Sequence, residues 1–200
     1  MNKDHIQKVL YHYSKNLDKQ SSNESLEQEK AILERFIDFI TTEKNCFERS
    51  SLHGHITASA LLLNKSKDKT LLTLHKKLNK WLQVGGHADG CTQPEEVALK
   101  EAYEESGLVQ IDFFKHPSLF ADKLILPIDL DIHHIPEHKK VPPHLHYDIR
   151  YVLVSTNSDA TKISSESIDL RWFSFVEAEE TTKDTSLKRL LLKVKKLLQQ

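Results

Sequence analysis

Apolar side chains near the start of the chain recur at intervals of three and four residues, the spacing that places them on one face of a helix. Two such stripes are present, separated by a polar stretch at 18–23. The first is Ile6, Val9, Leu10, Tyr13 and Leu17, and the second is Ile32, Leu33, Phe36, Ile37 and Ile40. Ser25 and Gln28 have the spacing of a capping box for the second helix. The pattern therefore predicts a helical extension over 1–50, with its last helix ending near Cys46.

From residue 51 the pattern changes to short apolar runs separated by polar loops, which is typical of strands. The runs ITASALLL and TLLTLHK, joined by NKSKDK, predict two strands. Further strands are predicted in LFADKLILPIDLDIHHI, HYDIRYVLVS and LRWFSF. Together with the helices, these strands indicate one mixed α/β or α+β domain over 51–200.

A final apolar stripe, flanked by basic residues, predicts a C-terminal helix. Its members are Leu187, Leu190, Leu191, Val194 and Leu198. A basic amphipathic helix can bind a membrane surface, but such a stripe in a globular protein usually packs on the protein's own core. We therefore expect this helix to dock on its own domain, and we expect no membrane partner.

The composition is that of an ordinary globular protein, with 38% apolar and 28% charged residues. Basic and acidic side chains number 28 and 29, so the net charge gives no reason to expect nucleic acid as a partner. The start MNKDHIQKVL lacks the pattern of a secretory signal, which makes the cytoplasm the expected location. Cys46 and Cys91 fit neither a disulfide framework nor a CxxC pair, and both are expected to be free thiols.

Four of the five glycines lie in GGHADGCTQPEEVALKEAYEESGL, at 85–108. Thr92 and Glu95 have the spacing of a capping box, and Gly107 fits a left-handed helix stop. A helix is therefore predicted over 93–106. Its buried stripe is predicted to be Val97, Ala98, Leu99 and Ala102.

Three glutamates share the other side of this predicted helix. Glu101, Glu104 and Glu105 are three and four residues apart or adjacent, so their carboxylates converge and repel one another. A divalent cation relieves that repulsion, and Mg²⁺ prefers carboxylate oxygens together with water and substrate phosphates. The alternative is a solvated acidic face, but the nearby glycines favour a ligand site because they let the backbone approach closely.

This stretch resembles the Nudix box, GX5EX7REUXEEXGU, in which U is a bulky aliphatic residue. Gly86 opens the box, Gly107-Leu108 closes it, and the three glutamates occupy the acidic positions of its core. The order of GHITASALLL, LNKWLQVGGHADG, HLHYDIRYVLV and DLRWFSFVE is also similar to Nudix proteins of the GGHxDG type, including their helical N-terminal addition. The resemblance thus covers most of the chain.

Three positions depart from the box. Thr92 replaces its first glutamate, Lys100 replaces its arginine, and Ala102 is small where a larger aliphatic residue is usual. Lys100 keeps the positive charge but lacks the planar fork that can orient a carboxylate. Thr92 is interpreted as a trait of the GGHxDG subfamily more than as a sign of inactivation.

The resemblance implies an α/β/α sandwich around a mixed sheet, with the box forming a loop, a helix and a second loop. It also implies a metal-dependent pyrophosphohydrolase that uses Mg²⁺ or Mn²⁺ to cleave a nucleoside diphosphate linked to another moiety, or a related phosphoanhydride. By position, Glu101, Glu104 and Glu105 would bind the metal together with the carbonyl of Gly85. Glu101 or Glu104 would serve as general base.

Two other functions stay open at this stage. One is a Nudix domain that binds a nucleotide without turnover, as a sensor or a partner-binding protein, with catalysis weakened at Thr92 and Lys100. The other is an isoprenoid diphosphate isomerase, which would need a well-placed catalytic cysteine, and Cys91 is a poor candidate by position. The N-terminal helices either cover the domain or pair two subunits as a homodimer.

Five of the twelve histidines lie between Asp131 and Asp148. Strand alternation in HLHYD places His144, His146 and Asp148 on one face. We expect His87, His146 and Asp148 to contact the substrate or to supply further metal ligands, since imidazole suits transition metals. For the others, His133, His134 and His138, we favour surface or hydrogen-bonded positions.

Overall fold

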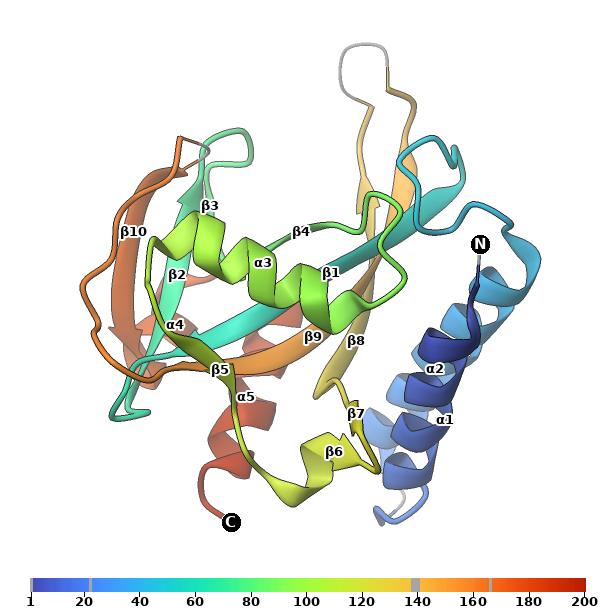
Figure 1. The fold of residues 1–200 in the computed structure, drawn as a ribbon, viewed down its shortest axis with the longest axis horizontal. Helices are drawn as coiled ribbons and strands as arrows, with labels where there is room; N and C mark the ends of the chain where they lie inside the picture. Colours follow the sequence, from blue (N-terminus) through green and yellow to red (C-terminus); the bar gives the residue numbers. More distant parts are fainter. Residues whose placement is uncertain (1, 22, 138–140, 166) are drawn as a thin grey trace.

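The computed structural model describes residues 2–21, 23–137, 141–165 and 167–200. Among these residues, no helix has the length and apolar character needed to cross a membrane. The described chain contains the predicted N-terminal helices, a curled mixed sheet and further helices on both faces of that sheet (Figure 1).

The N-terminal helices are α1 (Asp4–Leu17) and α2 (Glu24–Thr42). The predicted apolar stripe of α1 is buried throughout. In α2 the stripe is buried in part, and Ile37 is exposed. The predicted start at Ser25 is wrong by two residues, because Asn23 caps the helix and accepts a 3.0 Å hydrogen bond from the backbone of Leu26. Asparagine and serine are about equally good caps, so sequence alone does not decide between them.

The large sheet is built around β1 (Gly54–Leu63), which lies parallel to β9 (His144–Ser155) and antiparallel to β2 (Lys69–His75) and β4 (Val84–His87). The strand order along its main path is β10-β2-β1-β9-β5, with β3, β4 and β8 paired to the side. The remaining bounds are β3 (Lys80–Leu82), β5 (Ile111–Phe113), β8 (Asp129–Ile135) and β10 (Ser167–Ser174). A short 3-10 turn (Pro117–Leu119) precedes a small hairpin of β6 (Phe120–Ala121) and β7 (Leu124–Ile125).

Helices cover the sheet on both sides (Figure 1). On one face lie α3 (Pro94–Ser106) and, beside it, α1 and α2. On the other face lie α4 (Phe175–Thr181) and α5 (Thr185–Leu197). This arrangement confirms the predicted α/β/α sandwich. The apolar stripe of α5 is buried against its own domain, as predicted for a docked helix.

Candidate functional site

Strand β1 gives its two faces different chemistry. Ile56, Ala58 and Ala60 belong to the apolar core under α3. The alternate residues His55, Thr57 and Ser59 point to the opposite face, because successive side chains of a strand alternate. All of these residues are buried. One face of β1 therefore packs the core under α3, and the first half of its other face carries polar groups inside the protein.

Helix α3 ends as predicted and starts differently. Gly107 adopts the left-handed conformation, with φ of 66°, and closes the helix. The predicted cap by Thr92 is wrong, since Gln93 is the N-cap residue and makes no side-chain capping hydrogen bond. Pro94 opens the helix with a backbone that has no N–H to satisfy. Thr92 is interpreted as a trait of the GGHxDG subfamily whether or not it caps the helix.

The underside of α3 explains the small residue within the box. Val97, Ala98 and Ala102 are buried against the sheet, as predicted. Ala102 has no exposed surface, so a larger aliphatic side chain there would push the helix away from β1. Glu95, predicted to be part of a cap, is instead buried, and its Oε1 lies 2.6 Å from Nε2 of His5 on α1.

Two of the three glutamates meet the backbone of β4. The N–H of Gly85 donates a 2.8 Å hydrogen bond to Oε1 of Glu105. A Cβ at Gly86 would lie 2.7 Å from both carboxylate oxygens of Glu101, which only glycine avoids. The third glutamate, Glu104, has 58% of its side chain exposed. The paired glycines thus let the carboxylates of α3 close onto the edge strand.

Lys100 lies among these carboxylates. Its Nζ is 3.2 Å from Oε2 of Glu104 and 3.4 Å from Oε1 of Glu101. The hydrogen bond to Glu104 raises the pKa of Lys100, which therefore stays charged at neutral pH. The ammonium group supplies part of the positive charge that this cluster of carboxylates requires.

The donor atoms at this edge suit a hard divalent cation. Gly85 lies opposite Ser59, and its N–H points away from β1 toward Glu105. In an antiparallel pair the N–H and C=O of one residue point the same way, so the carbonyl of Gly85 also faces outward. Carboxylate and carbonyl oxygens are the ligands that Mg²⁺ and Mn²⁺ prefer. Glu101, Glu104, Glu105 and Gly85 therefore fit the cation implied by the box.

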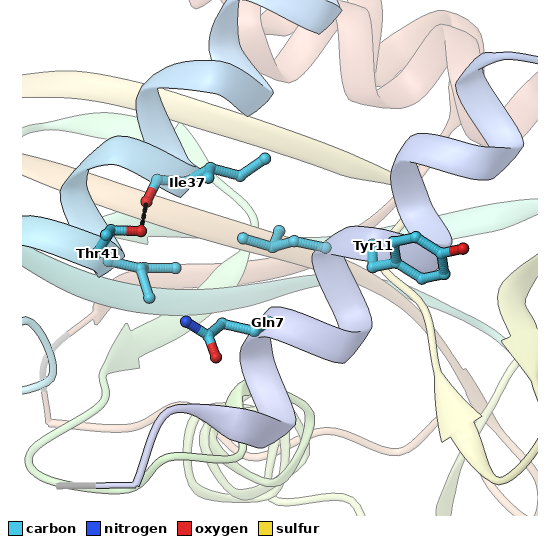
Figure 2. Close-up of a pocket in the computed structure, with 6 residues that line it drawn as sticks. Gln7, Tyr11, Ile37 and Thr41 are labelled. Atoms are coloured by element: carbon cyan, nitrogen blue, oxygen red, sulfur yellow. Dashed lines mark hydrogen bonds between the residues drawn. The ribbon is translucent and has the colours of Figure 1, made fainter.

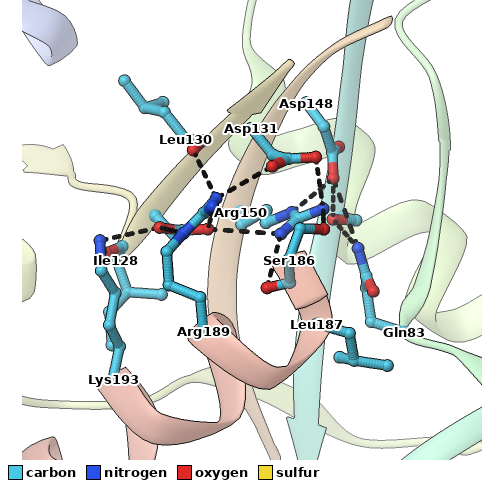
Figure 3. Close-up of polar contacts among 12 residues, drawn as sticks. Gln83, Ile128, Leu130, Asp131, Asp148, Arg150, Ser186, Leu187, Arg189 and Lys193 are labelled. Carbon is cyan, nitrogen blue, oxygen red and sulfur yellow. Dashed lines mark hydrogen bonds and ion pairs between the residues drawn. The ribbon is translucent and has the colours of Figure 1, made fainter. Parts of the chain in front are cut away.

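On the face of the sheet opposite α3, charged side chains form a buried group, shown in Figure 3. We call Asp129, Asp131, Asp148, Arg150 and Arg189 the charge cluster. The Arg150 guanidinium contacts all three carboxylates, at 2.9 Å for Asp148, 3.0 Å for Asp131 and 3.3 Å for Asp129. Arg189 of α5 adds contacts of 2.9 and 3.0 Å to Asp129 and Asp131. Each carboxylate in the cluster thus has a cationic partner.

These contacts set the ionisation of the cluster. Burial alone raises the pKa of Asp129, but Lys193, Arg189 and Arg150 outweigh it and hold that pKa below its ordinary value. The pKa of Asp131 is likewise lowered, because hydrogen bonds and nearby arginines outweigh its burial. Asp129 and Asp131 are therefore ionised at neutral pH and stabilise the fold as ion pairs.

Asp148, which we expected at the substrate, lies within this cluster. It is buried and accepts hydrogen bonds from Thr57 at 3.0 Å, Ser59 at 2.7 Å and Arg150 at 2.9 Å. Sequence reasoning placed Asp148 on the correct face with His146. It missed that the carboxylate oxygens are already occupied by neighbouring side chains.

The charge cluster is connected through ion pairs to the N-terminal helix α2 and to the last helix, α5. Lys193 of α5 lies 2.7 Å from Asp129 and also pairs with Glu29 of α2. Glu29 in turn accepts a hydrogen bond from the hydroxyl of Tyr13 on α1. The sequence places Lys193 among the basic residues that flank the apolar stripe and does not indicate this ion pair, because a long-range contact leaves no local pattern.

Next to the charge cluster, on the same face of the sheet, three imidazoles lie close together. We call His55, His87 and His146 the histidine cluster. Their ring centroids are separated by 5.1 Å (His55 and His87), 4.7 Å (His55 and His146) and 4.9 Å (His87 and His146). Sequence reasoning named His87 and His146 and missed His55, which lies opposite His146 in the parallel register of β1 and β9.

The remaining histidines differ in their contacts and in their exposure. His133 lies 5.3 Å from the ring of His146, and its Nδ1 is 3.1 Å from Asp131. His144 lies 4.9 Å from the ring of His55, and its Nδ1 is 2.9 Å from the carbonyl of Pro142. His134 is exposed, as predicted. His138 lies outside the described residues.

A separate hollow of about 250 Å³ lies between α1 and α2, shown in Figure 2. Its lining is Gln7, Leu10, Tyr11, Ile37, Ile40 and Thr41. The hydroxyl of Thr41 is already bonded to the carbonyl of Ile37, at 2.7 Å. None of these six residues is acidic, basic, histidine or cysteine, so the hollow offers no chemistry comparable to that of the sheet.

Both cysteines are free thiols, as predicted. Cys46 is buried in the core, and burial raises the pKa of its thiol. Cys91 is half-buried, and its sulfur lies 3.5 Å from the carbonyl of Gln93. Cys46 therefore lacks the depressed pKa and the open position of a reactive cysteine.

Comparison with known proteins gives a consistent picture. The NUDIX domain family matches residues 53–194. Among solved structures, the chain is similar to a hydrolase of the NUDIX family from Clostridium perfringens, with 28% identity and a TM-score of 0.55 over 72% of this chain and 97% of that one. It is also similar to an Ap4A hydrolase from C. elegans, with 18% identity and a TM-score of 0.54 over 72% and 96% of the two chains. No curated protein matches.

Proposed function

Because this chain belongs to the Nudix family and is a Nudix hydrolase, we propose that it cleaves a nucleoside diphosphate linked to another moiety, or a related phosphoanhydride, with Mg²⁺ or Mn²⁺ as cofactor. One observation carries the proposal. The carboxylates of Glu101 and Glu105 close onto Gly86 and Gly85, in the register of the Nudix box. That contact brings hard oxygen donors together beside a backbone that a ligand can approach.

Four groups would hold the cation, namely the carboxylates of Glu101, Glu104 and Glu105 and the carbonyl of Gly85. The bound cation would supply neutralisation of phosphate charge and a lowered pKa of a coordinated water. Glu101 or Glu104 accepts the proton of the attacking water as its oxygen bonds to phosphorus and the anhydride bond breaks. Lys100, which pairs with both of these glutamates, holds them in place before the cation binds.

We propose that the substrate also meets the polar face of the sheet through His87 and His146, which are partly exposed. Asp148 would act indirectly, since it is buried and fixes Thr57, which lies opposite His87 in the β1 and β4 pair. The nucleotide would thus be held next to β4, with the glutamates at the edge of that strand.

The helical extension of 1–50 is proposed to cover the domain of 51–200 rather than to act alone. Phe36 and Phe39 of α2 pack on Tyr147, with ring centroids 5.3 and 3.8 Å apart. The ammonium group of Lys3 also bonds to the carbonyl of Ile40, at 2.6 Å. The bond from Lys3 joins the start of α1 to α2, and the aromatic contacts with Tyr147 join the extension to the same core as the sheet.

The experiment is a phosphate-release and mass-spectrometric screen of nucleoside diphosphate derivatives and Ap4A, with Mg²⁺, with Mn²⁺ and with chelator. Glu105→Gln is expected to lower kcat/KM by about 100-fold or more, because loss of even an indirect metal contact costs up to about that factor. Glu96→Gln is the matched control, since Glu96 is exposed on the same helix. Equal rates for Glu105→Gln and Glu96→Gln would contradict the metal assignment.

A second candidate function is nucleotide binding without turnover. It is favoured by Lys100, whose ion pairs with Glu101 and Glu104 compete with a cation for the same carboxylates. Micromolar-range binding of a nucleotide with no metal-dependent cleavage across the screen would support it. Restoration of cleavage by Lys100→Arg would then locate the defect at this position.

A further inference from the structure

Three strands each contribute one imidazole to the same small volume. His55 comes from β1, His87 from β4 and His146 from β9. One ligand nitrogen from each residue can be chosen so that all three lie within 4.8 Å of one another. These side chains are positioned by sheet register and are not gathered from mobile loops, since His55 lies opposite His146 and His87 lies opposite Thr57.

Three of the six ring nitrogens in this cluster are buried and have no hydrogen-bond partner among the described residues. His55 is only 3% exposed, and neither of its ring nitrogens makes a hydrogen bond of ordinary geometry within the described chain. The Nε2 of His146 is in the same condition. An unsatisfied buried nitrogen is costly, and in native structures such a group calls for a specific explanation, an ion among them.

The imidazoles are in the form that binds metals. Burial lowers the pKa of His55 to about 4 and that of His146 to about 2, and the nearby His144 lowers both further. The backbone of Ser51 opposes this fall at His55 without reversing it. These two rings are therefore uncharged at neutral pH. Neutral imidazole is a ligand for transition metals and lacks the charge that would attract a phosphate.

We infer that His55, His87 and His146 form a binding site for Zn²⁺ or a similar transition-metal ion, separate from the glutamate site. Zinc takes histidine nitrogens at about 2.0–2.1 Å, and three protein ligands leave a fourth position for water or an anionic group. Tetrahedral bonds of that length place the nitrogens roughly 3.4 Å apart. The rings must therefore close slightly, and His87 and His146, which are only partly buried, have the room to turn.

The two sites are placed back to back across β4. Gly86 faces α3 and Glu101, whereas the next residue, His87, faces the histidine cluster. Their ligand chemistry also differs, since one set offers only oxygen and the other only nitrogen. An ion in the histidine cluster would contact the substrate in place of His87 and His146. The metal site itself does not depend on the proposed hydrolysis.

The test is zinc binding by the metal-stripped full chain, with excess Mg²⁺ present to occupy the carboxylates. Metal content after dialysis gives the stoichiometry, and visible absorption of bound Co²⁺ reports nitrogen coordination. One ion per chain is expected, both in the native sequence and in Glu105→Gln. His55→Gln and His146→Gln are expected to weaken zinc binding by about 100-fold or more.

The matched control is His134→Gln, because His134 is an exposed histidine on β8 and should leave zinc binding unchanged. Circular dichroism of the metal-free variants checks their folding, and if His55→Gln does not fold, His87→Gln on the edge strand takes its place. The inference is overturned by the absence of zinc binding under excess Mg²⁺. It is also overturned by equal loss in His134→Gln and His146→Gln, or by loss in Glu105→Gln alone.

Discussion

The charge cluster and the histidine cluster adjoin on one face of the sheet and share strand β9, yet their polar atoms are satisfied to very different degrees. Along β9, His146 is followed two residues later by Asp148 and two residues after that by Arg150. Arg150 bonds three carboxylates, and Asp148 accepts hydrogen bonds from four side chains. Within the described part of the chain, the ring nitrogens of His55 have no hydrogen-bond partner. A buried polar group that is fully paired belongs to the scaffold, whereas one without a partner indicates a ligand from outside the chain.

The largest effect on stability is expected when Arg150, at the centre of the charge cluster, is replaced. Arg150→Met leaves Asp129, Asp131 and Asp148 buried together with less positive charge among them. We expect a loss of about 3–5 kcal/mol in the free energy of unfolding, as for one partner removed from a buried ion pair. Urea denaturation measures it. The control is Arg171→Met, whose exposed pair with Asp169 should contribute at most about 1 kcal/mol. Similar losses in the two variants would contradict the role given to Arg150.

A smaller effect on stability is expected from Arg189, at the border of the charge cluster, and this effect should depend on pH. Arg189→Met removes one cation from Asp129 and Asp131, and we expect a loss of about 1.5–3 kcal/mol in unfolding free energy at pH 7. The pKa values of both carboxyls are lowered in the folded protein, so their stabilisation is present above the ordinary aspartate pKa and is lost as the pH falls through and below that value.

The difference between Arg189→Met and the native protein should therefore shrink in acid. Urea titrations of both proteins at neutral pH and at about pH 3, near the lower edge of the ordinary aspartate range, would show it. A difference that stays constant or grows on acidification would mean that Arg189 stabilises the fold by packing and not by charge.

The smallest effect on stability is expected in the histidine cluster. His55→Leu in the metal-free protein removes two nitrogens that have no hydrogen-bond partner among residues 2–21, 23–137, 141–165 and 167–200, so the free energy of unfolding should change by less than about 1 kcal/mol or rise. Thermal unfolding with and without Zn²⁺ provides the readout. Zinc should raise the Tm of the native protein and leave that of the variant unchanged. A loss well above 2 kcal/mol without metal would show that His55 already has a stabilising partner.

The helix of the box could be predicted because its pattern is local. The spacing of Glu101, Glu104 and Glu105 and the stop at Gly107 lie within a few helical turns, and the structure has the helix over Pro94–Ser106. The capping residues were predicted less well. Thr92 and Ser25 both match a preferred pattern, but the helices start at Pro94, which suits a first helical position, and at Glu24, after the cap by Asn23.

The buried polar clusters could not be predicted in the same way. His55 precedes ITASALLL, whose small and apolar residues conceal the alternation between a packed and a polar face. Arg150 meets Asp129 only through the pairing of β8 and β9, and Arg189 reaches them from a different helix. Register and helix docking decide these contacts, and neither is written in the local spacing of residues.

The ion pair between Glu29 and Lys193 also constrains the order in which folding contacts can form while the chain is synthesised. The two residues are separated by 164 positions, so Glu29 has left the ribosome long before its cationic partner is made. The same holds for Asp129, which meets Arg189 60 positions later. Until α5 is translated, these carboxylates have no lysine or arginine from that helix to pair with. The buried contacts between the two ends of the sequence are therefore among the last that a nascent chain can form.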